Sequence, residues 1–286
     1  MKIRFWGVRG SIPVPGAGTS VWGGNSSCVE VEAADGSSLM LDGGTGARLC
    51  GQSLLQRRVR HVHVLFTHFH TDHIFGFPFF GPIYAPSCSV DVGIPAFGSS
   101  ELHNPLARYM NGVFHPVRLS DLGDRVVCRN VRPNSVFEMG PFRVTGTVMN
   151  HPGGAMGYRV EVDGQVMTYL TDTAPLARPD EGLMAGYGPP LLEQRVMELL
   201  EASDLAIFDT MFSRDEYLEK MTWGHAYPEY ALRLAQEADV RRLALFHHSP
   251  EATDAELDRL DAHWRGAEGP VSVFCAKEGE AVDLEG

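Results

Sequence analysis

The chain has 286 residues, with 24 Lys and Arg against 36 Asp and Glu, so its formal net charge is −12. An acidic chain disfavours general binding to nucleic acid or to an anionic membrane, because both repel it. Five scattered cysteines without a CxxC pair indicate reduced thiols. No apolar leader and no apolar run of about 18 residues occurs, so we expect a cytoplasmic protein without a transmembrane helix.

Apolar periodicity and turn residues predict an alternation of strands and helices, as expected for an α/β protein. Strands are expected at residues 2–6, 28–32, 38–41, 62–66, 83–85, 89–94, 126–131, 142–149, 157–162, 166–170, 204–208, 242–246 and 271–274. Helices are expected at residues 46–58, 99–110 and 191–202, and after capping or proline signals at 213, 228 and 253. Asp163-Gly164 predicts a tight hairpin, and the Pro- and Gly-rich residues 175–190 predict a loop over one face.

A loop after the strand at 62–66 carries the densest set of ligand-type side chains, His68-Phe69-His70-Thr71-Asp72-His73. Three imidazoles and a carboxylate in six residues are costly to crowd together unless a cation binds them. Neutral imidazole and ionised carboxylate are both good ligands for a divalent ion such as zinc. His68 and His70 can point one way while Asp72 and His73 point another, so this loop could serve two ions.

Three more ligand-type residues follow predicted strands, namely His151, Asp172 and His247. A lone His at a strand end is more often a hydrogen-bonded structural residue, but together these residues could complete two coordination shells at one edge of a sheet. Asp42 also ends an apolar strand, where a carboxylate is costly to bury unpaired. It could orient a ligand imidazole, or it could form a turn before Gly43.

HFHTDH matches the HxHxDH signature of the metallo-β-lactamase-fold hydrolases. The segments GVRGSIP, GGNSSCVEV, LDGGTG, NHPGGAMGYR, TDT and LFHHSP resemble the phosphodiesterase-like branch of that family. This branch includes the tRNA 3′-processing endonucleases and cyclic-phosphate phosphodiesterases. The resemblance implies a four-layer αββα fold, with two mixed β-sheets sandwiched between helices, as one domain over residues 1–286.

The resemblance also implies a dinuclear centre that binds two divalent ions, with Zn²⁺ expected and Mn²⁺ or Fe as alternatives. The implied ligands are His68, His70 and His151 for one ion, Asp72, His73 and His247 for the other, and Asp172 as the bridge. We prefer His247 to His248 because it directly follows the strand. Asp72 and Asp172 are therefore also expected to be catalytic.

A second catalytic signal lies in WGHAYPEYALRLA, which resembles a WGHST segment of the same branch. There the His is thought to assist protonation of the leaving group, and His225 matches it. Ala226-Tyr227 departs from the Ser-Thr pattern, so a structural His at a helix entry remains an alternative. Arg9 could bind a phosphate, although a surface or structural role is preferred, and His115 is expected to be an ordinary packed or surface His.

The function expected from these observations is hydrolysis of a phosphodiester by a metal-bridging hydroxide, with a small molecule as substrate, for example a cyclic nucleotide-like one. RNA is disfavoured because no Lys- or Arg-rich segment is present to bind it. A lactone or thioester hydrolase and a non-catalytic metal-binding sensor are the alternatives. A di-iron redox role is disfavoured by His70, because the flavin-linked members usually carry Glu there. Nothing in the sequence predicts a membrane partner, and a homodimer is left open.

Overall fold

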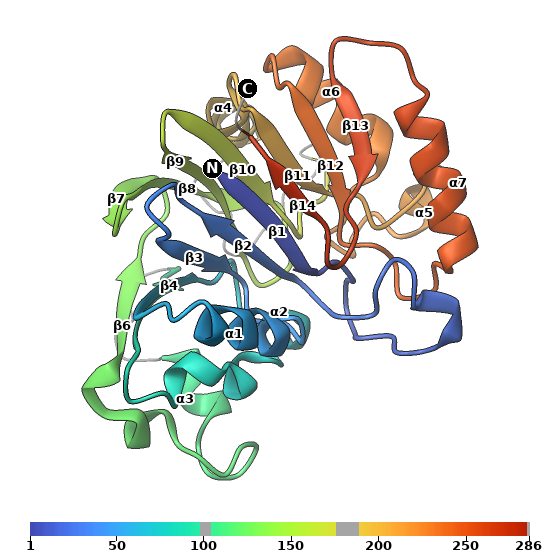
Figure 1. Cartoon of the computed structure of the whole chain (residues 1–286). Coiled ribbons are helices and arrows are strands. Elements are labelled where there is room, and N and C mark those ends of the chain that lie inside the picture. Colours follow the sequence, from blue (N-terminus) through green and yellow to red (C-terminus); the bar gives the residue numbers. More distant parts are fainter. Residues whose placement is uncertain (98–103, 176–188, 285–286) are drawn as a thin grey trace.

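The computed structural model describes residues 1–97, 104–175 and 189–284, and in this part of the chain two seven-stranded mixed sheets pack face to face (Figure 1). The first sheet has, in spatial order, β14 (Ala281–Asp283), β1 (Lys2–Gly7), β2 (Cys28–Glu32), β3 (Ser38–Leu41), β4 (His61–Leu65), β5 (Ser89–Pro95) and β6 (Val126–Val131). The second has β13 (Ser272–Cys275), β12 (Arg242–Phe246), β11 (Leu205–Asp209), β10 (Gln165–Leu170), β9 (Ala155–Val162), β8 (Phe142–Met149) and β7 (Ser135–Met139).

The central core lies between the two sheets and consists of the inward-facing residues of their strands. Ile3 and Phe5 from β1 pack in the same buried cluster as Tyr158 from β9 and Phe246 from β12. Alternation along each strand sends every second side chain into this layer, where burial of a large apolar side chain contributes about 1.5–3 kcal/mol. The hydroxyl of Tyr158 also donates a hydrogen bond of 2.6 Å to the carbonyl oxygen of Phe66, which connects the second sheet to the loop after β4.

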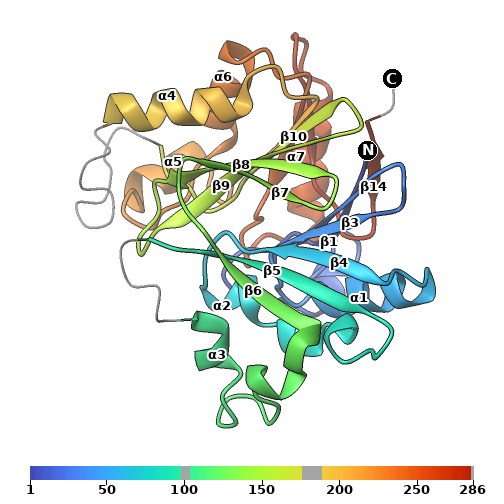
Figure 2. The same ribbon diagram turned by 90° about the vertical axis from the view of Figure 1, so that its left-hand side faces the viewer.

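Helices cover the outer face of each sheet, which gives four layers (Figures 1 and 2). The first sheet is covered by α1 (Ala47–Gln56), α2 (Thr71–Ile74) and α3 (Pro105–Tyr109), and the second by α4 (Pro189–Leu200), α6 (Pro228–Glu237) and α7 (Asp254–Arg265). The short helix α5 spans Arg214–Glu219. The four-layer αββα architecture predicted from the sequence is confirmed. None of the helices in the described ranges is both long and apolar enough to cross a membrane.

Local signals in the sequence account for several element boundaries. Ser213 and Thr253 form the predicted capping boxes of α5 and α7, with Glu216 and Glu256 as their reciprocal partners. The hairpin between β9 and β10 turns at Asp163, whose φ is 57°, followed by Gly164 at 73°. Both residues are left-handed, as the two-residue turn between right-twisted strands requires.

Three strand predictions need correction. Residues 83–85 do not form a strand, because Gly81–Ile83 is a single 3₁₀ turn that begins with Gly-Pro and buries Ile83 beneath α1. The edge strands β7 and β14 were not predicted: β7 alternates between half-buried and exposed residues, and β14 has only three residues. Of the helix predicted over 99–110, the described part forms α3, and residues 176–188 of the predicted loop lie outside the described residues.

The strand directions bring several strand ends to one edge of the sandwich. In the first sheet β3 and β4 run parallel, and in the second sheet β10, β11 and β12 run parallel. β8 has the same direction as β10, because each pairs antiparallel with β9. The loops that follow these strands therefore meet at one edge, where α/β folds commonly build their sites.

Candidate metal centre

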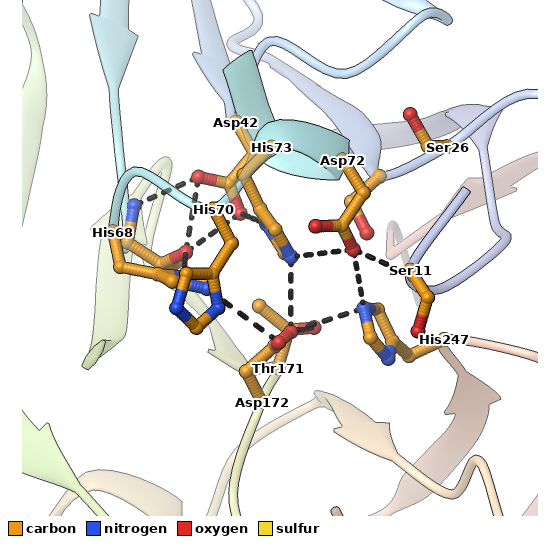
Figure 3. Close-up of polar contacts among 12 residues, drawn as sticks. Ser11, Ser26, Asp42, His68, His70, Asp72, His73, Thr171, Asp172 and His247 are labelled. Atoms are coloured by element: carbon orange, nitrogen blue, oxygen red, sulfur yellow. Dashed lines mark hydrogen bonds and ion pairs between the residues drawn. The ribbon is translucent and has the colours of Figure 1, made fainter. Parts of the chain in front are cut away.

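The predicted ligand residues converge at this edge, and Figure 3 labels all of them except His151. Three residues that lie just after strands, Asp42, Asp172 and His247, have positive φ values of 59°, 53° and 62°. Positive φ is uncommon for residues other than Gly, although Asp, Asn and His adopt it more readily than most. Such backbone conformations gather at functional sites, where the surrounding structure enforces them.

One cluster contains His68, His70, His151 and Asp172, whose candidate ligand atoms all lie within 4.8 Å of one another. Nε2 of His151 lies 3.0 Å from Nδ1 of His70 and 3.5 Å from Oδ2 of Asp172. Nε2 of His68 lies 3.6 Å from the same carboxylate oxygen. Three imidazole nitrogens and one carboxylate oxygen therefore surround a common point.

A second cluster contains Asp72, His73, His247 and again Asp172, with its candidate ligand atoms within the same limit of 4.8 Å. Nε2 of His73 and Nε2 of His247 each lie 3.1 Å from Oδ1 of Asp172. The same two nitrogens lie 3.2 Å and 3.3 Å from Oδ2 of Asp72. Asp172 thus presents Oδ2 to the first cluster and Oδ1 to the second.

Partners outside the clusters turn the imidazoles inward. Nδ1 of His73 donates to Asp42, Nδ1 of His151 donates to the carbonyl oxygen of Gly224 at 3.0 Å, and Nδ1 of His68 contacts the hydroxyl of Thr67. Nε2 of His68 and of His73 are buried and have no hydrogen-bond partner among the described residues. Inward lone pairs that lack protein partners, beside carboxylates, fit a divalent cation of the zinc type.

The protonation states of two cluster residues, His68 and Asp172, suit the same conclusion. Burial lowers the pKa of His68, which favours the neutral imidazole that a metal requires. The pKa of Asp172 lies well below its usual range: burial opposes this shift, but the histidines His247, His73 and His68 favour the carboxylate. Both residues are therefore in the protonation state that binds a cation.

Asp42 supports the loop after β4 from outside the clusters. Its fully buried carboxylate accepts hydrogen bonds from the backbone N–H of Thr67 at 2.7 Å, from Nδ1 of His73 at 2.8 Å and from the hydroxyl of Tyr169 at 3.1 Å. Of the two roles considered for Asp42, the structure places it where it orients a cluster imidazole. Its positive φ shows that it also forms the turn before Gly43.

His225 lies beside both clusters. Its ring stacks on His247 at a centroid distance of 5.0 Å and lies 5.5 Å from the ring of His151. Nδ1 of His225 donates to Oδ2 of Asp209 at 2.8 Å. Burial lowers the pKa of His225, but the carboxylates of Asp209, Asp172 and Asp72 together outweigh burial and raise it to about 9.

The sequence analysis did not single out Asp209 as a site residue. The available signal was its position at the end of β11, which repeats the position of Asp172 after β10. Sequence alone did not indicate Ser11 either: its backbone N–H donates to Oδ2 of Asp72 at 2.8 Å, from a left-handed conformation with φ of 61°.

Three other residues lie outside the clusters. Nε2 of His248 donates to the carbonyl oxygen of Ala276 at 2.7 Å, so of the two neighbours only His247 belongs to a cluster. Arg9 is fully buried and donates to the carbonyl oxygens of Gly23, Ser249 and Ala252, which is a structural role. His115 packs edge-on against Phe79 and contacts the backbone of Val117, as expected for an ordinary His.

Comparison with known proteins identifies the family of this chain. A family model described as a β-lactamase superfamily domain matches residues 39–248, which include every residue of the two clusters. The chain belongs to this superfamily. Ribonuclease Z of Thermoplasma volcanium is 23% identical to this chain over 294 residues, and the match covers 89% of this chain and 89% of that protein.

Solved structures show the same fold. The metallo-β-lactamase fold protein YhfI from Bacillus subtilis is 18% identical in sequence to this chain, and the two structures align with a TM-score of 0.68 over 98% of both chains. A diphosphatase from the PhnP family is also 18% identical, with a TM-score of 0.66 over 99% of this chain and 98% of that chain. The family predicted from HFHTDH is confirmed, and the protein is a metal-dependent hydrolase.

Proposed function

We propose that this protein is a dinuclear metal-dependent phosphodiesterase. The observation that carries the proposal is the position of Asp172, whose two carboxylate oxygens face two different histidine clusters. A carboxylate shared in this way is what a two-metal site requires, because the ions must lie about 3.5–4 Å apart to act on one phosphoryl group. A mononuclear site would need only one of the two clusters.

In this proposal each ion has four protein ligands. The ligands are His68, His70, Asp172 and His151 for one ion and Asp72, His73, His247 and Asp172 for the other. Zn²⁺ is the expected ion because imidazole and carboxylate are its usual partners, with Mn²⁺ or Fe as alternatives. Bound divalent ions would supply Lewis-acid polarisation of the phosphoryl oxygens and lower the pKa of water towards neutrality.

The protein's own residues then perform the remaining tasks. Asp42 and Gly224 orient the imidazoles of His73 and His151 through hydrogen bonds to their Nδ1 atoms. Asp209 orients His225 beside both clusters, where it can donate a proton to the leaving oxygen. The buried position of these groups excludes water from their hydrogen bonds, which keeps the geometry preorganised.

The preferred substrate is a small phosphodiester, including a cyclic nucleotide-like molecule. The chain carries a net charge of −12 and has no Lys- or Arg-rich segment, so it lacks the usual means of binding a long polyanion. RNA is the second candidate, because curated relatives across most of the chain are named Ribonuclease Z. In either case the bond hydrolysed is a phosphodiester.

The Asp172→Asn variant tests this proposal, because Asn tolerates the left-handed backbone of this position but removes the charge. We expect it to bind less metal and to lose at least about a thousandfold in phosphodiesterase activity, as each 1.4 kcal/mol of lost stabilisation is tenfold in rate. Asp239→Asn is the matched control, since Asp239 has a φ of 54° at an exposed position. Full activity of Asp172→Asn with unchanged metal content would refute the shared carboxylate.

A further inference from the structure

A separate group of ligand-type residues lies at the opposite end of β4. His61 and His63 are two residues apart on this strand, so their side chains lie on the same face. Asp91 of β5 pairs directly with His63 in the parallel ladder. One candidate ligand atom from each of these three residues lies within 4.8 Å of the others. β4 spans about 13 Å between this group and the loop that carries His68.

The exposed His61 and the half-buried Asp91 are already oriented towards each other. Nδ1 of His61 lies 2.6 Å from the hydroxyl oxygen of Ser89, and this contact leaves Nε2 to face Asp91, whose Oδ2 is 3.5 Å away. The rings of His61 and His63 meet edge-on with centroids 4.5 Å apart. A hydrogen bond to the remote nitrogen is how proteins commonly aim a metal-binding imidazole.

The buried imidazole of His63 has a feature that an ordinary surface ion pair does not explain. It is 5% exposed, and its Nδ1 is buried without a hydrogen-bond partner among the described residues. A buried polar atom without a partner is costly and calls for an explanation such as an ion. Burial lowers the pKa of His63 to about 4, so at neutral pH the imidazole is uncharged and retains a lone pair.

Asp91 has open space beside it for an ion and its water molecules. It borders a cavity of about 440 Å³ lined by residues of β5, β6 and β7, which neither His61 nor His63 lines. Among the described residues, the carboxylate of Asp91 contacts two basic side chains, the imidazole of His61 and the guanidinium of Arg129, which lies 3.6 Å from Oδ2. The Arg129 side chain is largely exposed, so it can move away and be replaced by a metal ion.

We propose that His61, His63 and Asp91 bind a divalent transition-metal ion, independently of the centre that contains Asp172. Two imidazoles and one carboxylate suit Zn²⁺, and Cu²⁺ or Ni²⁺ bind the same ligand types. Three protein ligands leave a coordination position for water, and the exposed His61 makes the ion exchangeable. The bound ion would connect β4 to β5 at the end of the sheet remote from the hydrolytic centre.

Equilibrium dialysis at a series of fixed free Zn²⁺ concentrations, followed by metal analysis, tests this site in the full-length protein. We expect the wild type to bind one ion per chain more than His61→Ala and Asp91→Asn, whatever number the main centre holds. His263→Ala is the matched control, because His263 is an exposed His on α7, and it should retain the ion. Equal metal content of wild type and His61→Ala at every Zn²⁺ concentration would overturn the proposal.

Two further variants separate a specific site from loose binding to surface imidazoles. Ser89→Ala removes the partner that aims His61 and should weaken the affinity for this ion about 10- to 100-fold. Arg129→Gln removes the competing cation and should strengthen it. Unchanged affinity in both variants would indicate that the ligands are not held as proposed. The phosphodiesterase activity of His61→Ala at saturating metal should equal that of the wild type, which keeps this test separate from the main centre.

Discussion

Nδ1 of His73 donates a hydrogen bond of 2.8 Å to Oδ2 of Asp42, a residue 31 positions earlier in the chain. This contact joins the end of β3 to the helical turn α2 and points Nε2 of His73 towards Asp72 and Asp172. The carboxylate also increases the basicity of the imidazole and fixes its tautomer. The orientation of one cluster residue therefore depends on a carboxylate that does not itself belong to either cluster.

Replacement of Asp42 by Asn should weaken metal binding about 10- to 100-fold, the usual effect of losing such a partner. Asn tolerates the positive φ of this position, so the backbone is retained while the charged acceptor is lost. Affinity is measured by competition with a chelator of known strength. Asp239→Asn serves again as the matched control, and an Asp42→Asn variant with wild-type affinity would exclude the orienting role.

Replacement of His225 by Ala should lower kcat about 10²- to 10⁴-fold, the range of a lost general acid, without loss of bound metal. The loss should be smaller for a p-nitrophenolate leaving group than for an alkoxide, because nitrophenolate needs little protonation. Steady-state kinetics on both types of phosphodiester, with metal analysis of each sample, gives the comparison. An equal loss on both substrates would favour the alternative that His225 is structural.

Asp209→Asn should reproduce part of the His225→Ala defect, because Asp209 accepts the Nδ1 hydrogen bond of His225. Asp209 belongs to neither of the two clusters, so the metal content of the variant should stay at the wild-type value. The kcat values of the single and double variants form a double-mutant cycle. Additive losses would show that the two residues act independently, contrary to this account.

The choice between a small phosphodiester and RNA is tested by salt. Binding of a polyanion through several cationic side chains releases counterions, so its affinity falls steeply as salt rises. We expect KM for a small phosphodiester to change less than about threefold between 50 and 200 mM salt, as few phosphate contacts are involved. A precursor tRNA cleaved with higher kcat/KM than any small phosphodiester would instead make RNA the substrate.

The hydroxyl of Tyr158 should stabilise the fold, because it donates to the carbonyl oxygen of Phe66 just before the HFHTDH loop. Tyr158→Phe leaves this buried acceptor without that partner and should lower the free energy of unfolding by about 1–3 kcal/mol. Urea unfolding of metal-free protein measures the change. Tyr84→Phe is the control, since Tyr84 is partly exposed and water can replace its bond to Pro78, so a similar loss in both variants would contradict the prediction.

The sequence predicted the ends of most strands, and with them the residues that meet at the site, because ligand-type residues stand within two residues of the ends of apolar runs. His151 and His247 are examples, and both lie in the clusters. Asp209 was missed because its contact with His225 depends on the path of the intervening loop, which no periodicity encodes. A cytoplasmic location and a homodimer stay predictions from the sequence.

The edge strand β7 and the segment 83–85 were also predicted wrongly, because their structure depends on contacts with other elements. Residues 135–139 form β7 only because β8 offers a partner, and the 83–85 segment packs under α1 rather than in a sheet. Short segments with mixed polarity take their structure from such tertiary contacts, which outweigh their own propensity. Interior strands such as β3 and β11, in contrast, are buried along their whole length, because both faces of each sheet are covered.

The most direct test of the central claim is hydrolysis of bis-p-nitrophenyl phosphate by zinc- or manganese-loaded protein, alongside a lactone and a thioester. The metal content is determined on the same sample, with His61→Ala used to count the ions of the main centre alone. We predict phosphodiester turnover with about two ions per chain in that variant, as a two-metal mechanism requires. Full occupancy with cleavage of the lactone or thioester only, or with no turnover at all, would contradict the assignment as a phosphodiesterase.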